Sequence, residues 1–246
     1  MRNLYRLVFA ESQNTDGVIA LTTQQNHYLS RVVRLQQGDR FIAMNGLGKS
    51  WLAQLETNQA KLLEILNLQT ELAVNLTLIT ALPKGSGYEQ VLRCCTELGV
   101  SRFVPVFSDR SLLKPSPNKV ARWRKIVIEA AEQSEREIVP QILDPLQFPE
   151  IITQLSSTSK SNYICLARGN NPSLWSAIPS ELPPEITIAI GAEGGWSDRE
   201  IVMAKNQGFQ AVSLGKSILR AVTAPIVTAT VVNTKINETE NLNLNS

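Results

Sequence analysis

The sequence predicts an α/β protein in which a mostly parallel sheet follows a small N-terminal β-barrel. Three observations predict this fold class. The first seventy residues form short apolar runs separated by turn residues, whereas strand-like and helical patterns alternate from about residue 73 onward. Such alternation favours a parallel sheet covered by helices on both faces. The length of 246 residues, with 43% hydrophobic and 19% charged residues, allows a sizeable core.

The N-terminal part, residues 1–72, is predicted to be the β-barrel domain. Its strands are expected at residues 4–10, 17–21, 40–46 and 49–55, with a helical stretch at residues 27–35. The pattern changes near residues 70–75, so we expect the domain boundary there.

The second domain is predicted to cover residues 73–246. Strands are expected at residues 74–82, 101–107, 163–167, 186–190 and 210–214, and helices at residues 88–99 and 119–135. The tail, residues 233–246, has five asparagines among fourteen residues and little to bury. We therefore expect the tail to be disordered.

The charge is unevenly distributed along the chain. The net charge is only +2, but residues 84–125 carry nine basic and three acidic residues, which indicates an anionic partner. In the helix expected at residues 119–135 the basic residues come first and the acidic residues last. This order opposes the helix dipole by about 0.3 to 1 kcal/mol for charges in the terminal turns. Phosphate contacts would offset this cost, and pairs such as Lys125 with Glu129 are the alternative.

Several classes of protein are disfavoured by the composition. The three cysteines lack metal-ligand spacing and the single histidine is His27, so no metal site is expected. No apolar run approaches the roughly 18 residues of a membrane span, and the N-terminus does not resemble a signal peptide. We therefore expect a cytoplasmic protein without a membrane partner.

A glycine-rich loop follows the strand expected at residues 186–190. The loop carries three glycines around Glu193, and then Ser197 and Glu200 have the spacing of a capping box that begins a helix. A second loop, residues 215–225, follows the next strand and offers Ile218 and Leu219, and Thr223 is expected to cap the last helix. Ligands of open α/β sheets bind at such strand ends.

The pair of loops suits a planar, partly apolar ligand such as a nucleoside, although the glycines of a single loop are also typical of simple turns. Two segments, GLGKS at residues 46–50 and LGKS at residues 214–217, resemble the end of a phosphate-binding P-loop. Both lack its first glycine, because Ala43 and Gln210 occupy that position. The sequence therefore indicates neither ATP nor GTP binding.

A family resemblance is carried by four segments in order: ALPKGSGYEQVLRCCTELGVSRFVPVFSDRS, RWRKIVIEAAEQSER, IGAEGGWSDREI and SLGKSILRAVTA. They resemble the RsmE family of ribosomal RNA methyltransferases, which belongs to the SPOUT class with a deep trefoil knot. The likeness runs from about residue 82 to 231. HYLSRVVRLQQGD and NGLGKS resemble the family's N-terminal PUA-like RNA-binding domain.

The resemblance implies methylation of N3 of a uridine in small-subunit (16S) ribosomal RNA, with S-adenosylmethionine as donor and a homodimer as the working unit. The partner would be ribosomal RNA or the small ribosomal subunit. Carried over by position, the cofactor-binding residues would be Leu166, Gly191, Glu193, Gly194, Gly195, Leu214, Gly215, Ile218, Leu219 and Arg220.

The chemistry implied for uridine requires help from charged residues, because N3 carries a proton and is a poor nucleophile until that proton leaves. A positioned base contributes roughly 10² to 10⁴-fold, and a cation near O2 or O4 would stabilise the anionic base. Our hypothesis is that Arg220 or Arg136 supplies the positive charge. Glu193 is either the general base or a cap for backbone amides.

Basic residues are also expected to contact the phosphates of RNA, with arginine suited to two-point contacts. The candidates in the first domain are Arg2, Arg6, Arg31 and Arg34, of which Arg31 and Arg34 are expected to share a helix face. In the second domain they are Lys84, Arg110, Lys114 and Arg122. For any one of them, an ordinary solvated surface position is the alternative.

The chain also departs from the family pattern. Ala192 stands for the usual proline of the glycine loop, Ala221 and Val222 replace the Thr-Glu that usually follows Arg220, and Gly87 replaces a common basic residue. Two alternative functions therefore stay open. One is a catalytically impaired ribosome-binding or assembly relative, and the other is a SPOUT enzyme that methylates a ribose hydroxyl or another base.

Overall fold

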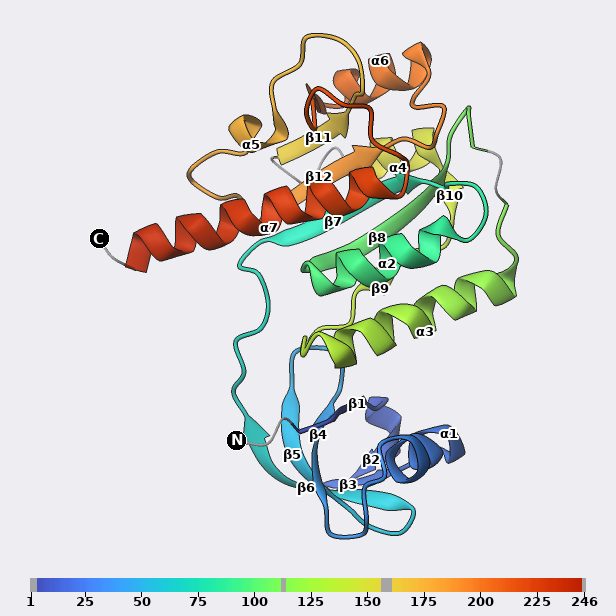
Figure 1. Cartoon of the computed structure of the whole chain (residues 1–246), viewed down its shortest axis with the longest axis vertical. Coiled ribbons are helices and arrows are strands. Elements are labelled where there is room, and N and C mark those ends of the chain that lie inside the picture. Colours follow the sequence, from blue (N-terminus) through green and yellow to red (C-terminus); the bar gives the residue numbers. More distant parts are fainter. Residues whose placement is uncertain (1–3, 112–113, 156–160, 245–246) are drawn as a thin grey trace. The chain divides into compact units, whose positions relative to one another are not determined.

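The computed structural model describes residues 4–111, 114–155 and 161–244 of the chain. The chain divides into two compact units: residues 1–71 with 128–139, and residues 72–127 with 140–246 (Figure 1). The sequence analysis expected one break near residue 72 and did not anticipate that residues 128–139 return to the first unit.

The first unit contains one six-stranded sheet in the order β1-β4-β5-β6-β3-β2. Its strands are β1 (Arg6–Val8), β2 (Asn14–Thr15), β3 (Val18–Ala20), β4 (Arg40–Met44), β5 (Ser50–Leu55) and β6 (Gln59–Leu66). β1 and β4 are parallel, and the other pairs are antiparallel. The sheet curls around buried Phe9, Ile19, Leu29 and Phe41, and forms a half-barrel because its two edge strands do not pair.

Strand β6 was not predicted from the sequence. Its side chains are largely exposed and include Lys61 and Glu64, so it lacks a clear alternation of apolar and polar residues. Its pairing with β5 on one side and β3 on the other decides its conformation.

The helical stretch of the first unit differs from the expected residues 27–35. Helix α1 (Thr23–His27) begins earlier, with Thr22 and Gln25 forming a capping box, and continues as a π-helix, η2 (Tyr28–Val32). Arg34 lies beyond the end of this helix with φ of 63°. The expectation that Arg31 and Arg34 share a helix face is therefore wrong.

The second unit is built on a seven-stranded sheet in which every pair of neighbouring strands is parallel, as predicted. The strand order is β10-β8-β7-β12-β11-β13, with β9 also paired to β8. The strands are β7 (Asn75–Ala81), β8 (Val100–Phe107), β9 (Gln141–Ile142), β10 (Leu146–Gln147), β11 (Ser161–Cys165), β12 (Glu185–Ile190) and β13 (Gln210–Val212).

Helices cover both faces of this sheet. From residue 87 onward the described residues form α2 (Gly87–Glu97), α3 (Pro117–Gln133), α4 (Phe148–Leu155), α5 (Leu174–Ala177), α6 (Asp198–Asn206) and α7 (Thr223–Leu244), of which α3 begins in the second unit and ends in the first. Helices α2 and α7 pack together against β7 and β8, while α4 and α6 pack together around Phe148, which stacks on Trp196 (Figure 1). The apolar strands are therefore buried on both sides.

The expectation of a disordered tail is wrong, because α7 continues to Leu244. Ile236 is fully buried, the Asn233 side-chain amide donates to the Leu98 carbonyl at 3.2 Å, and the Lys235 ammonium lies 4.8 Å from the ring centre of Trp175. Tertiary contacts thus override the weak helix propensity of the asparagines.

The reversed charges of α3 have partners within the chain. At its N-terminal end, Lys119 Nζ donates to the Gly85 carbonyl at 3.1 Å, and Arg122 and Arg124 pair with Glu89 and Asp144 at 3.0 and 2.7 Å. These contacts offset the unfavourable dipole without any phosphate.

The C-terminal end of α3 is part of the first unit, and two carboxylates hold it against the N-terminal strand. Glu132 accepts a hydrogen bond from the Val8 N–H at 2.7 Å, and Glu135 pairs with Arg6 at 2.8 Å. Burial raises the pKa of Glu132 to about 7; the hydrogen bond from the Val8 N–H lowers it by less, and the nearby negative charge of Glu129 adds to the rise. The acidic end of the helix is therefore used to hold residues 128–139 against β1.

Within the part of the chain that the structure describes, no helix combines the length and apolar character that a membrane crossing requires.

Candidate functional site

The carboxyl ends of three neighbouring strands of the second unit meet at one edge of the sheet. β11 pairs with β12 on one side, where Ile164 faces Ala189, and with β13 on the other, where Cys165 faces Val212. The segments that follow these strands must therefore lie side by side, which is where parallel α/β sheets bind ligands.

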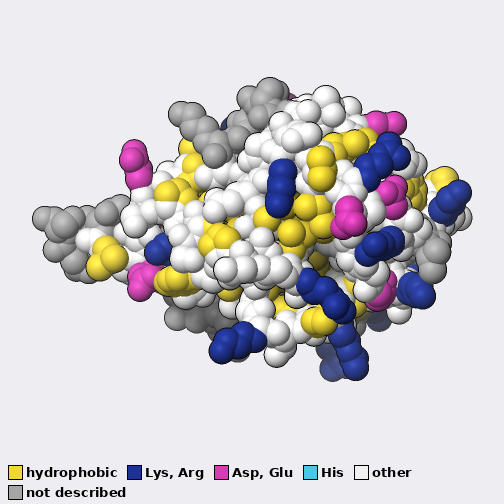
Figure 2. All heavy atoms as spheres, turned by 90° about the horizontal axis from the view of Figure 1, so that it is seen from above, with side chains coloured by type: hydrophobic (Ala, Val, Ile, Leu, Met, Phe, Trp, Pro, Cys, Tyr) yellow, Lys and Arg dark blue, Asp and Glu magenta, His cyan; other side chains and the backbone are white. Residues whose placement is uncertain are grey.

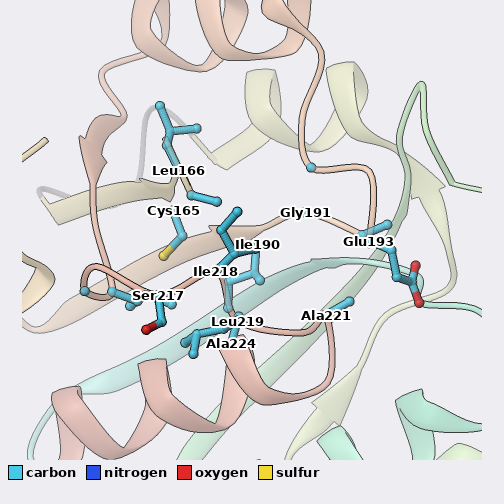
Figure 3. A pocket seen from close by; sticks show the side chains of 15 residues that line it. Cys165, Leu166, Ile190, Gly191, Glu193, Ser217, Ile218, Leu219, Ala221 and Ala224 are labelled. Atoms are coloured by element: carbon cyan, nitrogen blue, oxygen red, sulfur yellow. The ribbon is translucent and has the colours of Figure 1, made fainter. Parts of the chain in front are cut away.

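A pocket lies between these segments (Figure 3). Its walls are Cys165, Leu166 and Ala167 after β11, Ile190, Gly191, Ala192, Glu193 and Gly195 after β12, and Leu214, Gly215, Ser217, Ile218, Leu219, Ala221 and Ala224 after β13. Apolar side chains and glycines line it together, and Ile218 is 66% exposed. Such a lining suits a flat, partly apolar molecule that reads backbone donors and acceptors.

The glycine loop, residues 191–196, folds back on itself. The Gly195 N–H donates to the Ala192 carbonyl at 2.8 Å, and Gly195 has φ of 67°, which favours glycine. A Cβ on Gly191 would lie 3.0 Å from the Gly195 carbonyl carbon and 3.2 Å from the Trp196 nitrogen. Because these neighbours are backbone atoms, only glycine fits at residue 191 without a shift of the loop.

Glu193 is held by the backbone of a neighbouring loop. Its Oε1 accepts a hydrogen bond from the Lys84 N–H at 3.0 Å, and its carboxylate points away from the side chains of Ile218 and Leu219 (Figure 3). This geometry favours the backbone-capping alternative for Glu193 over the general base.

The capping box at the start of α6 is confirmed and has an additional partner. Ser197 Oγ accepts from the Glu200 N–H, and Glu200 Oε2 accepts from the Ser197 N–H at 2.8 Å. The other carboxylate oxygen of Glu200 accepts from the Asp109 N–H at 2.9 Å, and Ser197 Oγ donates to Asp109 at 2.6 Å. Next to this cluster, Arg110 Nη1 donates to the Gly194 carbonyl at 2.6 Å.

The loop after β13, residues 213–222, leads directly into α7. The helix begins at Thr223 itself rather than after a Thr223 cap, and the N–H groups of Thr223 and Ala224 both donate to the Arg220 carbonyl at 2.9 Å. The Arg220 side chain is exposed and does not line the pocket, although its neighbours Leu219 and Ala221 do.

Two of the departures from the family pattern lie together in space. A Cβ on Gly87 would be 2.6 Å from Cγ2 of Val222, so the two residues are in contact. Both departures therefore fall at the same contact. Residue 87 lacks the basic side chain and residue 222 lacks the acidic one, so neither position carries an unpaired charge.

Eight of the ten predicted cofactor residues line the pocket: Leu166, Gly191, Glu193, Gly195, Leu214, Gly215, Ile218 and Leu219. Gly194 lies beneath Arg110 instead. Arg136 belongs to the first unit, where its side chain is 4% exposed and its Nε donates to Glu71 at 3.1 Å. This pairing gives Arg136 a structural task.

The pocket also contains residues that the sequence analysis missed, among them Cys165, Ile190, Ala192, Ser217 and Ala221. Extending each loop back to the last residue of its strand would have identified the first two. Burial raises the pKa of Cys165 to about 12, while its contact with Thr228 lowers it, so the sulfur stays a neutral thiol.

The expected RNA-contacting residues are in different situations. Arg2 lies outside the described residues, and the Arg6 side chain is 9% exposed and paired with Glu135. Arg31, Arg34, Lys84 and Lys114 are exposed. Arg122 is 68% exposed while paired with Glu89. Figure 2 shows Lys and Arg side chains spread around exposed hydrophobic side chains on the face that it draws, with acidic side chains among them.

Among the described residues, no three side chains of His, Cys, Asp or Glu are grouped as metal ligands would be.

Comparisons with known proteins identify the family of the chain. The family model of an RNA methyltransferase domain matches residues 70–233, and that of an RNA methyltransferase PUA domain matches residues 21–66. Ribosomal RNA small subunit methyltransferase E of Synechocystis is 48% identical over 233 residues, which cover 93% of this chain and 77% of that protein. The Bacillus subtilis protein of the same name is 30% identical over 84% of this chain and 86% of its own.

A solved structure is similar over nearly the whole length. It is a ribosomal RNA small subunit methyltransferase E from Neisseria gonorrhoeae bound to S-adenosyl methionine, 29% identical, with a TM-score of 0.84 over 94% of this chain and 97% of that one. With both family models matched in order and a relative this similar over most of both chains, the protein belongs to the ribosomal RNA small subunit methyltransferase E family of RNA methyltransferases.

Proposed function

We propose that this protein binds S-adenosylmethionine in the pocket beyond β11, β12 and β13 and methylates N3 of a uridine in small-subunit (16S) ribosomal RNA. The observation that carries the proposal is the convergence of three strand-end segments on one apolar, backbone-lined pocket in a chain of this family.

The pocket fits this cofactor by its shape and chemistry. There is open space where a Cβ on Gly195 would stand, the close backbone approach at Gly191 keeps the loop compact, and Ile218 and Leu219 offer apolar surface for a flat ring. The sulfonium centre of the bound donor would supply an electrophilic methyl group. This chemistry requires no metal ion.

Arg220 is the residue that we assign to stabilising the uridine anion. It sits between two pocket-lining residues, Leu219 and Ala221, and its own side chain is exposed. A guanidinium near the O2 or O4 of uracil would favour loss of the N3 proton, because it stabilises the negative charge that develops there. Arg136 is not included, since its guanidinium is buried against Glu71.

We infer that RNA is held by exposed basic residues in both units, namely Arg31 and Arg34 in the first and Lys84, Lys114 and Arg122 in the second. Arg6 leaves this group because its guanidinium is engaged by Glu135. Each phosphate contact makes binding weaker as salt rises. A binding constant that does not change between low and high salt would remove phosphate contacts from the proposal.

The assembly is part of the same proposal. We expect a trefoil knot in the second unit, a homodimer as the active form, the small ribosomal subunit as partner and the cytoplasm as the location. These expectations derive from the family. Sedimentation at micromolar concentration would test the dimer, and a monomer with full methyl-transfer activity would contradict it.

The decisive experiment joins cofactor binding with methyl transfer. S-adenosylmethionine is titrated into the purified protein by calorimetry, and small subunits from a strain without the enzyme are then incubated with protein and labelled donor. We expect saturable binding and one N3-methyluridine, located by mass spectrometry of nuclease fragments. Methyl transfer to a ribose hydroxyl or another base would contradict the uridine N3 assignment.

Cofactor and subunit binding without any transfer would instead favour the catalytically impaired relative. The contact between Gly87 and Val222 is the observation that supports this alternative, because two uncharged residues meet where the family resemblance leads us to expect a basic and an acidic residue.

A further inference from the structure

The loop between β8 and α3 contacts the glycine loop through Arg110. Nη1 of Arg110 donates to the Gly194 carbonyl at 2.6 Å. A Cβ on Gly194 would lie 3.1 Å from Cδ and 3.2 Å from Cβ of Arg110. The aliphatic part of the Arg110 side chain therefore packs along Gly194, and its guanidinium makes the hydrogen bond to the Gly194 carbonyl.

Arg110 is itself held in place by the residues around it. Ser108 and Ser111 close the turn that carries it, with the Ser108 N–H donating to Ser111 Oγ at 3.1 Å and the two hydroxyls 2.8 Å apart. The preceding residue, Asp109, binds Ser197 and Glu200 at the start of α6. The β8–α3 turn is thus fastened to the segment that follows the glycine loop.

Gly194 itself does not line the pocket, but Glu193 and Gly195 on either side of it do. A hydrogen bond to the Gly194 carbonyl fixes the orientation of the peptide between Gly194 and Gly195. A hydrogen bond with one charged partner is stronger than a neutral one. Fixing a glycine-rich loop before binding removes an entropic cost that the ligand would otherwise bear.

We propose that Arg110 is a positioning residue for the cofactor, acting through Gly194 to hold the glycine loop in its binding shape. The proposal builds on S-adenosylmethionine as ligand of this pocket. It also replaces the phosphate-binding role expected from the sequence, because the guanidinium is directed to a carbonyl of its own chain.

The test uses Arg110→Met, which keeps most of the stem and loses the guanidinium, and Arg110→Lys, which keeps the charge. Arg199→Met is the matched control, because Arg199 is an exposed arginine at the start of α6. Three quantities are measured for each: the Kd for S-adenosylmethionine by calorimetry, KM for the cofactor against kcat, and the salt dependence of binding to a small-subunit RNA fragment.

We expect Arg110→Met to raise the Kd and KM for the cofactor about 5- to 20-fold, near the lower limit of a charged hydrogen bond because Arg110 is exposed and acts through Gly194. At saturating cofactor, kcat and the salt dependence of RNA binding should stay as in the unaltered protein. Arg110→Lys should recover part of the loss, and Arg199→Met should leave the cofactor Kd unchanged.

An unchanged cofactor Kd, with weaker RNA binding and a salt dependence reduced by about one phosphate contact, would overturn the proposal and restore the phosphate role. Should Arg110→Met not fold, Arg110→Lys decides on the same measurements. If the unaltered protein failed to bind the cofactor, the proposed function would fail. If the unaltered protein binds the cofactor and only the Arg110 variants bind it more weakly, the positioning role of Arg110 is supported.

Discussion

The two loops that form most of the pocket are built in different ways. The loop after β12 is fastened on several sides, by Lys84 to Glu193, by Arg110 to Gly194 and by the capping box of Ser197. The loop after β13 contains Ile218, which is 66% exposed, and the exposed side chain of Arg220. Its local bonds include those of Ser213 with Gly215.

This difference suggests a division of labour. A loop with external anchors keeps its shape in the absence of ligand, so it is suited to define where the cofactor binds. A loop with an exposed arginine and isoleucine has side chains available for the ligand and the RNA. The predictions that follow test whether binding depends on the first loop and turnover on the second.

The largest effect is expected for Arg220→Ala, in the exposed loop. Loss of a charge that stabilises the uridine anion should lower kcat about 10²- to 10³-fold, while the Kd for S-adenosylmethionine changes less than about 3-fold. Single-turnover methyl transfer to small subunits measures the first quantity and calorimetry the second. Unimpaired turnover would remove Arg220 from the chemistry.

A smaller effect is expected for Gly191→Ala, in the anchored loop. The added methyl group would lie 3.0 Å from backbone atoms, so the loop must shift. We expect the cofactor Kd to rise about 10- to 50-fold, equivalent to about 1.5 to 2.5 kcal/mol. Gly208→Ala, a positive-φ glycine with open space around it, controls for backbone strain away from the pocket. Equal cofactor affinity in Gly191→Ala and the unaltered protein would show that the loop adapts freely.

A third prediction concerns Glu132, a buried carboxyl group whose raised pKa should make the stability of the protein depend on pH. In the first unit, Glu132 accepts from the Val8 N–H and has a pKa raised from 4.5 to about 7. Because the folded-state pKa is the higher one, the stability that it contributes is present below pH 4.5 and is lost as the pH rises to about 7.

Glu132→Gln should remove this pH dependence. Between pH 5 and pH 8, the free energy of unfolding of the unaltered protein should therefore fall by about 2 kcal/mol more than that of the variant. Urea unfolding at both pH values gives the comparison. Glu64→Gln, an exposed carboxylate on β6, is the control. A parallel pH response of the Glu132 variant and the unaltered protein would mean that Glu132 does not titrate as described.

A fourth change probes the contact between the exposed loop and α2. Gly87→Ala places a methyl group 2.6 Å from Val222 Cγ2, which should cost about 1 to 2 kcal/mol after the gain in helix propensity. Val222→Ala should relieve most of this cost in the double variant. A double-mutant cycle of thermal unfolding with an interaction energy near zero would show that the two residues do not touch.

The smallest effect is expected for Glu193→Gln. The amide oxygen of glutamine still accepts from the Lys84 N–H, but it cannot take a proton from uridine. If Glu193 anchors the loop, kcat should change less than about 3-fold, whereas loss of a general base would cost roughly 10²-fold or more. Measuring kcat at saturating cofactor separates these outcomes.

Local sequence patterns predicted much of this architecture. The capping box at Ser197 and Glu200, the glycine that closes α2 and the apolar runs of β7, β8, β11 and β12 are short-range signals, and the structure confirms each of them. Because the carboxyl ends of neighbouring parallel strands share one edge, these signals also indicated where a ligand binds. Eight of the ten residues carried over from the family resemblance line the pocket at this edge, and their role in cofactor binding stays a prediction.

Other features depended on partners that are distant in the sequence. The asparagine-rich tail is helical because Ile236 is buried and Asn233 binds the Leu98 carbonyl, contacts that no local propensity contains. β6 forms by pairing with both of its neighbours. The acidic end of α3 is explained by Val8 and Arg6.

The sequence by itself determined the two-part α/β organisation, the main strands of the parallel sheet, the glycine loop and the family, because these are written in residue type and short spacing. Only the tertiary structure decided the roles of the charged side chains. Arg6, Arg110 and Arg136 resemble phosphate or catalytic candidates in the sequence, yet each one binds an oxygen of its own chain. Charge is visible in a sequence, but the oxygen that each charged side chain contacts is brought near only by the fold.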